Sequence, residues 1–168
     1  MEDNKIILED DERDALDEER KDKVRILVFE LAREIYCVDI KQIKEIVRPA
    51  DITRVPNTPQ FVVGIMNLRG SILPVIDIRF FIGLEDRERT ENTRIIIINS
   101  KSGQMGIIAD RIRSTSDIDP EMVQTSITSA GENISRFTKG SIQIGGDIFA
   151  YLDLDKINDC DEINSLRK

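Results

Sequence analysis

Residues Gly64 to Ile78 read GIMNLRGSILPVIDI, and Gly140 to Leu154 read GSIQIGGDIFAYLDL, 76 positions later and without a gap. Most apolar positions of the first stretch are apolar again in the second. Four residues are identical at matching positions: Gly64 and Gly140, Gly70 and Gly146, Ile72 and Ile148, and Asp77 and Asp153. The chain therefore contains two copies of one fold unit.

A second match lies upstream of each copy, at an offset of 69. RILVF at 25–29 aligns with RIIII at 94–98, and the difference of seven positions corresponds to one loop insertion. Trp is absent and aromatic residues make up only 5% of the chain. Ile, Val and Leu must therefore fill the core, and branched side chains favour strands. Both copies are predicted to be β structure.

The strand pattern of each copy predicts a small barrel. The first copy opens with a hairpin that turns at 32–34, and its later hairpin turns at Gly70-Ser71, where glycine supplies a positive φ angle. About five short strands at close spacing favour a closed barrel over a βαβ unit. The run Ile95–Ile98 implies burial on both faces, as between two barrels. We predict two barrels in tandem with a short terminal helix over 154–166.

Local signals predict short helical segments around these strands. Residues 41–48 fit either a helical turn leading into a strand or a strand outright. Residues 60–64 fit one helical turn before a strand that begins at Ile65. Asp119 is placed to cap a helix that starts at Pro120.

The negative charge is concentrated in the first 23 residues. They hold 11 acidic and 5 basic side chains of a chain whose net charge is −8. This composition predicts a disordered arm, with a docking peptide at Ile6–Leu8 as the alternative. An acidic chain without a basic patch argues against binding nucleic acid or an anionic membrane surface. Without a signal peptide or an apolar run of spanning length, the protein is expected to be cytoplasmic.

The residues needed for most catalytic and cofactor chemistry are missing. Histidine is absent, and Cys37 and Cys160 lack the spacing of a metal or redox site, so no cofactor or metal is expected. The duplicated Asp77 and Asp153 resemble the carboxylate pair of a two-Asp hydrolase. They lie within strand patterns rather than in catalytic turns, so roles in capping or in holding turns are favoured.

Three polar or turn-forming positions differ between the two copies. Asn67, Arg69 and Pro74 of the first copy align with Gln143, Gly145 and Ala150 of the second. Arg69 offers five donors that suit a partner's carboxylate or carbonyl groups. An internal salt bridge, for instance to Glu45, fits equally well, and both interpretations stay open.

At these residues the chain resembles the CheW family of chemotaxis coupling proteins. The Asn-Leu-Arg-Gly and Pro-Val-Ile-Asp elements are the most specific part of the match. The resemblance covers about residues 24–157, and its motifs are FVVGIMNLRGSILPVIDIR at 61–79, VDIKQIKEI at 38–46, ITRVPN at 52–57, GIIADRI at 106–112 and the segment 148–154.

The resemblance implies an all-β fold of two five-stranded SH3-like barrels around a shared core, with short peripheral helices. The implied organisation has three parts: an arm at 1–23, a CheW-like domain at 24–157, and a helix or tail at 158–168. Within the domain, the barrels are expected at about 37–93 and 94–154, and a strand at 24–30 contributes to their shared core. The acidic arm, the Ser114–Ser116 stretch and residues 125–137 depart from the family pattern.

The resemblance also implies a non-enzymatic adaptor in chemosensory arrays. Its partners would be the regulatory domain of the histidine kinase CheA and the cytoplasmic tips of methyl-accepting chemoreceptors, which are helical hairpins. A scaffold of another CheA-type pathway, such as twitching motility, is the alternative. Matching positions assign receptor contacts to Glu45, Gly64, Arg69 and Ile112, and kinase contacts to Ile43 and Ile46.

Overall fold

Twelve strands form two six-stranded sheets in the part of the chain that the structure describes. The structure is a computed structural model that describes residues 14–15, 18, 22–100, 103–125 and 132–166. Most of the predicted arm at 1–23 lies outside these residues. Sheet A has the order β10 (Val123–Gln124), β11 (Thr138–Ile144), β12 (Asp147–Leu152), β2 (Glu34–Asp39), β1 (Val24–Leu31), β9 (Arg111–Ile118). Sheet B has the order β3 (Ile43–Val47), β7 (Arg94–Ser100), β8 (Gly103–Ala109), β6 (Ser71–Ile76), β5 (Val62–Leu68), β4 (Ile52–Thr53).

The two copies of the sequence repeat exchange their first hairpins. Strands β1 and β2 precede the first copy's remaining strands in the chain, yet they join β9 to β12 in sheet A, while β7 and β8 join β3 to β6 in sheet B. Each exchanged hairpin is attached through a parallel pair, β2 with β12 and β8 with β6. The predicted division at 37–93 and 94–154 stays a prediction, but the sheets cross it.

Three apolar clusters fill the molecule. Each sheet surrounds an inner core to which all six of its strands contribute, and a central core lies between the sheets. Ile95 and Ile97 belong to the inner core of sheet B, whereas Ile96 and Ile98 belong to the central core. This alternation confirms the prediction that the run 95–98 is buried on both faces.

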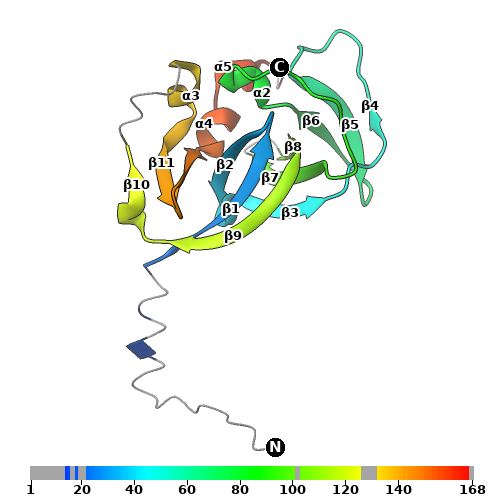
Figure 1. Ribbon diagram of the computed structural model, residues 1–168. Helices are drawn as coiled ribbons and strands as arrows, with labels where there is room; N and C mark the ends of the chain where they lie inside the picture. The colour runs from blue at the N-terminus through cyan, green and yellow to red at the C-terminus, as the bar shows by residue number, and fades with distance from the viewer. Residues whose placement is uncertain (1–13, 16–17, 19–21, 101–102, 126–131, 167–168) are drawn as a thin grey trace, which may run out of the picture.

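Short helices close one end of the central core, as Figure 1 shows for α2, α4 and α5. Phe81 of α2, Leu154 and Ile157 of α4, and Ile163 of α5 all pack into that core. The predicted terminal helix is therefore present as two pieces rather than one. The described helices are α2 (Arg79–Ile82), α3 (Glu132–Arg136), α4 (Leu154–Asn158) and α5 (Asp161–Ser165).

The structure confirms a mainly β fold and corrects some local predictions. Each sheet has six strands rather than five, and the described strand pairing does not close either sheet into a ring. Strand β5 begins at Val62 rather than Ile65. The turn expected at 60–64 is confined to residues 59–62, where the N–H of Val62 donates to the carbonyl of Pro59 over 2.9 Å. The strand then continues through a bulge between Val62 and Gly64. A 3-10 helix at 40–42 leads into β3, and another at 120–122 follows Asp119, as two of the local patterns predict.

Candidate partner-binding site

Arg69, in the turn between β5 and β6, forms a bidentate ion pair with Glu45 on strand β3. Both guanidinium Nη atoms donate to the carboxylate oxygens of Glu45 over 2.8 Å. The side chain of Arg69 is 73% exposed and that of Glu45 is 21% exposed. The hydrogen bonds from Arg69 hold the pKa of Glu45 below its ordinary value. The salt bridge that the sequence left open is therefore present, with the arginine still available to solvent.

The turn that carries Arg69 demands an unusual backbone conformation. Arg69 and Gly70 have φ angles of 51° and 88°, and the matching Gly145 and Gly146 have 58° and 88°. Two positive φ angles define the type I′ turn of a two-residue hairpin, which favours Gly or Asn at both places. The second copy uses glycine at both positions, but the first copy places an arginine in a region that L-residues avoid.

Asn67 stabilises the same turn in the first copy. Its Oδ1 accepts a hydrogen bond of 2.8 Å from the backbone N–H of Gly70. The side chain of Asn67 is exposed, as is that of Arg69. Two of the residues that distinguish the copies therefore act together, one holding the turn and the other extending from it toward Glu45.

The other predicted contact residues occupy three different environments. Ile46 lies on β3 and is 38% exposed. Ile43 and Ile112 are partly buried and pack against the central core, from β3 and β9 respectively. Gly64 is buried within β5. The structure thus brings together Glu45 and Arg69, and separately places Ile43 and Ile112 beside one core.

Gly64 is required by the close approach of two strands. A Cβ atom at this position would lie 2.4 Å from the carbonyl oxygen of Thr53 in β4. A Cβ at Gly140 would lie 2.4 Å from the carbonyl oxygen of Gln124 in β10. The duplicated glycine therefore has the same structural role in both sheets.

The duplicated aspartates hold backbone turns, as their position in the sequence predicts. Asp77 Oδ1 accepts from the backbone N–H of Arg79 at 3.0 Å. Asp153 Oδ1 accepts from the backbone N–H groups of Asp155 and Lys156 at 3.1 and 3.3 Å, which caps α4. In both copies a carboxylate satisfies N–H donors at a helix start.

Sequence reasoning missed a buried arginine that links the two sheets. Arg79 is 2% exposed, and its Nε lies 2.9 and 3.0 Å from the two carboxylate oxygens of Asp77. Its Nη1 donates to Asp110 at 3.2 Å, and the second oxygen of Asp110 accepts from the N–H of Ala32 at 2.7 Å. Position 79 aligns with Asp155 in the second copy, a reversal of charge just beyond the compared segment that is the one sequence signal of this residue.

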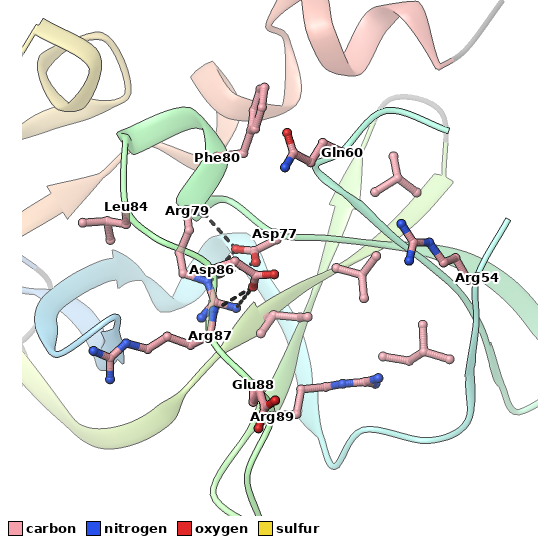
Figure 2. Close-up of a pocket in the computed structure, with 14 residues that line it drawn as sticks. Arg54, Gln60, Asp77, Arg79, Phe80, Leu84, Asp86, Arg87, Glu88 and Arg89 are labelled. Atoms are coloured by element: carbon pink, nitrogen blue, oxygen red, sulfur yellow. Dashed lines mark hydrogen bonds and ion pairs between the residues drawn. The ribbon is translucent and has the colours of Figure 1, made fainter. Parts of the chain in front are cut away.

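Arg79 also lies in a pocket of about 730 Å³. In Figure 2 dashed lines join Arg79 to Asp77 and Asp86, with which it forms ion pairs. Arg54 and Arg89 lie on one side of this group and Arg87 on the other. The walls combine apolar side chains with these charged groups. The remaining lining residues are Ile52, Gln60, Val62, Val63, Phe80, Leu84, Glu88 and Ile108.

The described residues offer few starting points for other kinds of site. They contain no cluster of three or more His, Cys, Asp or Glu side chains suited to a metal ion. Within the described part of the chain, no helix has the length and apolar character needed to cross a bilayer. Cys37 and Cys160 are buried, and burial raises the pKa of Cys37 to about 12, which disfavours its reactive thiolate form.

Comparison with known proteins identifies the family. The family model described as the CheW-like domain matches residues 25–161. The chain is 31% identical over 132 residues to chemotaxis protein CheW of Thermotoga maritima, covering 79% of this chain and 85% of that protein. It is 29% identical over 137 residues to chemotaxis protein CheW of Klebsiella aerogenes, covering 82% of each.

A solved structure shares the fold. The crystal structure of scaffolding protein TtCheW from Thermoanaerobacter tengcongensis matches with a TM-score of 0.74 at 30% identity, over 83% of this chain and 90% of that chain. The NLRG…PVID motifs lie within the residues that the family model matches. The chain belongs to the CheW-like domain family.

Proposed function

We propose that the protein is an adaptor that couples chemoreceptors to the histidine kinase CheA in chemotaxis signalling. The support is a CheW-like domain over residues 25–161, relatives named chemotaxis protein CheW, and a structural neighbour titled a scaffolding protein. These names favour chemotaxis over the alternative of another CheA-type pathway. The proposal places the binding site at Arg69 because of its backbone. Arg69 has an unfavourable positive φ angle at a position where the second copy has glycine.

In this proposal, receptor binding centres on the Arg69–Glu45 pair. Arg69 is exposed enough to exchange part of its pairing with Glu45 for a carboxylate or carbonyl of a receptor helix. Ile112 supplies apolar contact at the edge of the central core, and Gly64 contributes indirectly by keeping β4 close to β5. An amphipathic receptor helix suits such a combination of an apolar strip with polar groups beside it.

Kinase binding is assigned to the edge strand β3. Ile46 is exposed there, and Ile43 supports it from the central core. An exposed isoleucine on an edge strand suits an apolar contact with a second β domain. In this proposal the protein acts by contact alone, without catalysis, in the cytoplasm at membrane-bound receptor arrays.

The proposal includes an SH3-like barrel for each sheet. It is supported by the inner cores: Val47 of β3 and Ile52 of β4 lie at opposite ends of the strand order in sheet B, yet both pack on one cluster. Neighbouring strands lie about 4.8 Å apart, so a flat sheet would keep these ends about 24 Å apart. Curling of the sheet brings them together.

A pulldown tests the coupling function. The full chain would be presented to a CheA regulatory domain and to a receptor tip, with Arg69→Glu as the variant. We expect the unmutated protein to retain both partners and the variant to lose the receptor tip. If the unmutated protein retains neither partner, the coupling proposal fails. Loss of both partners together with a lowered melting temperature would instead assign Arg69 a purely structural role.

A matched variant makes the pulldown specific. Arg25 is 65% exposed and pairs with Asp117 through two hydrogen bonds, so it resembles Arg69 in exposure and pairing. It lies on β1 in sheet A. Arg25→Glu makes the same change of charge as Arg69→Glu and is expected to retain the receptor tip. Equal losses in the Arg25 and Arg69 variants would show that net charge, rather than the Arg69 site, controls retention.

A further inference from the structure

Strand β3 is an edge of sheet B that no described strand covers. It is five residues long, and its Ile46 is 38% exposed. An open edge offers unpaired N–H and C=O groups to another chain, and natural proteins shield such edges with charged side chains or with a covering segment. The edge therefore has room for an occupant, and its charges indicate which kind.

Three exposed cations along this edge form no salt bridge with any described residue. They are Lys41, Lys44 and Arg48. The two carboxylates among them are engaged, Glu45 by Arg69 and Asp39 by the N–H of Lys41. Residues 39–48 together with Arg69 carry four positive and two negative charges, and Asp51 and Arg54, which follow the strand, offset each other. The edge therefore favours an acidic occupant.

The acidic arm leaves the sheets between this basic edge and an acidic one. Val24, the first residue of β1, pairs with Ile118 of β9, which is followed by the exposed Asp119 and Glu121. On the other side, β1 pairs with β2 up to Asp39, and the 3-10 helix at 40–42 contacts β1. The first 23 residues carry a net charge of −6, from 11 acidic and 5 basic side chains. The arm is therefore repelled on the β9 side and attracted on the β3 side.

The arm is long enough to reach this edge, which begins where the arm joins the sheets. In Figure 1 the start of β1 and strand β3 both lie at the end of the molecule away from α2 and α5. Because the 3-10 helix contacts β1 and each residue adds at most about 3.5 Å, Lys44 lies within about 15 Å of β1. Residues 13–23 span about 36 Å when extended and about 16 Å when wholly helical. The carboxylates at 9–12 therefore reach Lys41 and Lys44 in either conformation.

The order of residues in the arm matches the order along the edge. Ile6, Ile7 and Leu8 form the longest apolar run before Val24, and four acidic residues follow at 9–12. An arm that runs along β3 from its start brings the carboxylates at 9–12 beside Lys41 and Lys44, and the apolar run next to Ile46. The branched side chains at 6 and 7 favour the extended conformation that an edge strand pairs with.

We propose that residues 6–12 of the acidic arm dock along the edge strand β3 of the same molecule. The segment runs antiparallel to β3, its carboxylates pair with Lys41 and Lys44, and Ile6 to Leu8 cover Ile46. Tethering gives the segment an effective concentration of about 1 mM, so contacts that are weak between separate molecules hold it in place. The docking does not rest on the proposed function; if Ile46 contacts the kinase, the docked arm competes for the same edge.

Paramagnetic relaxation in the full chain tests this docking. A nitroxide attached at Asn4→Cys would be read out on 15N-labelled protein, with Cys37 and Cys160 left in place because both are buried. We expect the amide signals of 46–51 to be lost, and those of 119–124, which follow the residue paired with Val24, to be retained. Lys41→Ser with Lys44→Ser should restore the lost signals, as should Ile6→Ser with Leu8→Ser.

A charge-matched control separates docking from general attraction. Arg87 and Arg89 are exposed in the loop between α2 and β7, so changing both to Ser removes the same charge elsewhere. Signals at 46–51 should stay lost in this control. Retention of these signals in the unmutated chain, equal restoration in both double variants, or loss at 119–124 as strong as at 46–51 overturns the proposal. Loss transferred from nitroxide-labelled to separate 15N-labelled molecules would identify the arm of a second copy and also overturn it.

Discussion

At the scale of single residues, Arg69 is where the two copies differ most in physical terms. The left-handed backbone region costs an L-residue about 1–2 kcal/mol. Gly145 occupies the matching place without that cost. Strained residues of this kind persist where the surroundings hold them, and here Glu45 and Asn67 do so. The sequence comparison singled out Arg69, but the backbone strain was visible only in the structure.

The first prediction concerns the stability of the Arg69 turn. Arg69→Gly restores the sequence that the second copy uses, and removes a side chain whose exposed ion pair is worth about 0–1 kcal/mol. We expect the free energy of unfolding, measured in urea, to stay within about 1 kcal/mol of the unmutated value, because relief of the positive φ angle offsets the lost pair. A drop well beyond that would mean that Arg69 serves the fold.

The second prediction concerns the ionisation of Glu45. Its pKa is lowered in the folded protein, chiefly by the hydrogen bonds from Arg69. A lowered pKa means that the pair contributes stability above the ordinary glutamate pKa of about 4.3, and that this contribution is lost as pH falls through the folded value. A 13C titration of the Glu45 carboxyl should show its pKa rising toward the ordinary value in Arg69→Gly. An unchanged pKa would contradict the pairing.

At the scale of strands and helices, the sequence predicted the secondary structure and burial of individual segments better than it predicted which segments contact one another. The glycine turns at 70 and 146, the aspartate roles at 77 and 153, and the burial of 95–98 all follow from local pattern. The bulge at Gly64 and helix α2 were not predicted, because they depend on close approaches to β4 and to the central core. Contacts of that kind leave no periodic signal.

The third prediction concerns the buried network around α2. Arg79→Met leaves Asp77 and Asp110 without their buried cation, and such a loss costs about 3–5 kcal/mol. Arg54→Met removes an exposed arginine of the same pocket, so it should change the free energy of unfolding by no more than about 0.5 kcal/mol. Urea unfolding of both variants provides the measurement. Similar values for the two would show that the network around Arg79 adds nothing to stability.

At the scale of the whole molecule, the exchanged hairpins make the two sheets interdependent. Sheet A cannot form without β1 and β2, which precede β3 in the chain, and sheet B needs β7 and β8, which precede β9. Periodicity and repeats identify strands and their order, but they do not say which copy's sheet a hairpin enters. That is why the predicted boundaries follow the chain while the sheets do not.

The fourth prediction is a single unfolding transition. Both tyrosines of the chain lie on strands of sheet A. Tyr151 packs in the inner core of that sheet and Tyr36 in the central core between the sheets, so tyrosine fluorescence reports on sheet A and on its packing against sheet B. Ile95 is fully buried in the inner core of sheet B. Ile95→Ala should cost about 2–5 kcal/mol, and should shift the tyrosine transition and the far-ultraviolet circular dichroism transition equally. An unshifted tyrosine transition would mean that the sheets unfold separately.

The central claim is that this CheW-like protein binds its partners through the site around Arg69. The most direct measurement is the affinity of a chemoreceptor tip for the full chain, by titration calorimetry, for the unmutated protein, Arg69→Gly and Arg25→Ala. We expect Arg69→Gly to bind at least about tenfold more weakly, corresponding to about 1.4 kcal/mol, with its fold intact, and Arg25→Ala to bind normally. Unchanged affinity in a correctly folded Arg69→Gly protein would contradict the account.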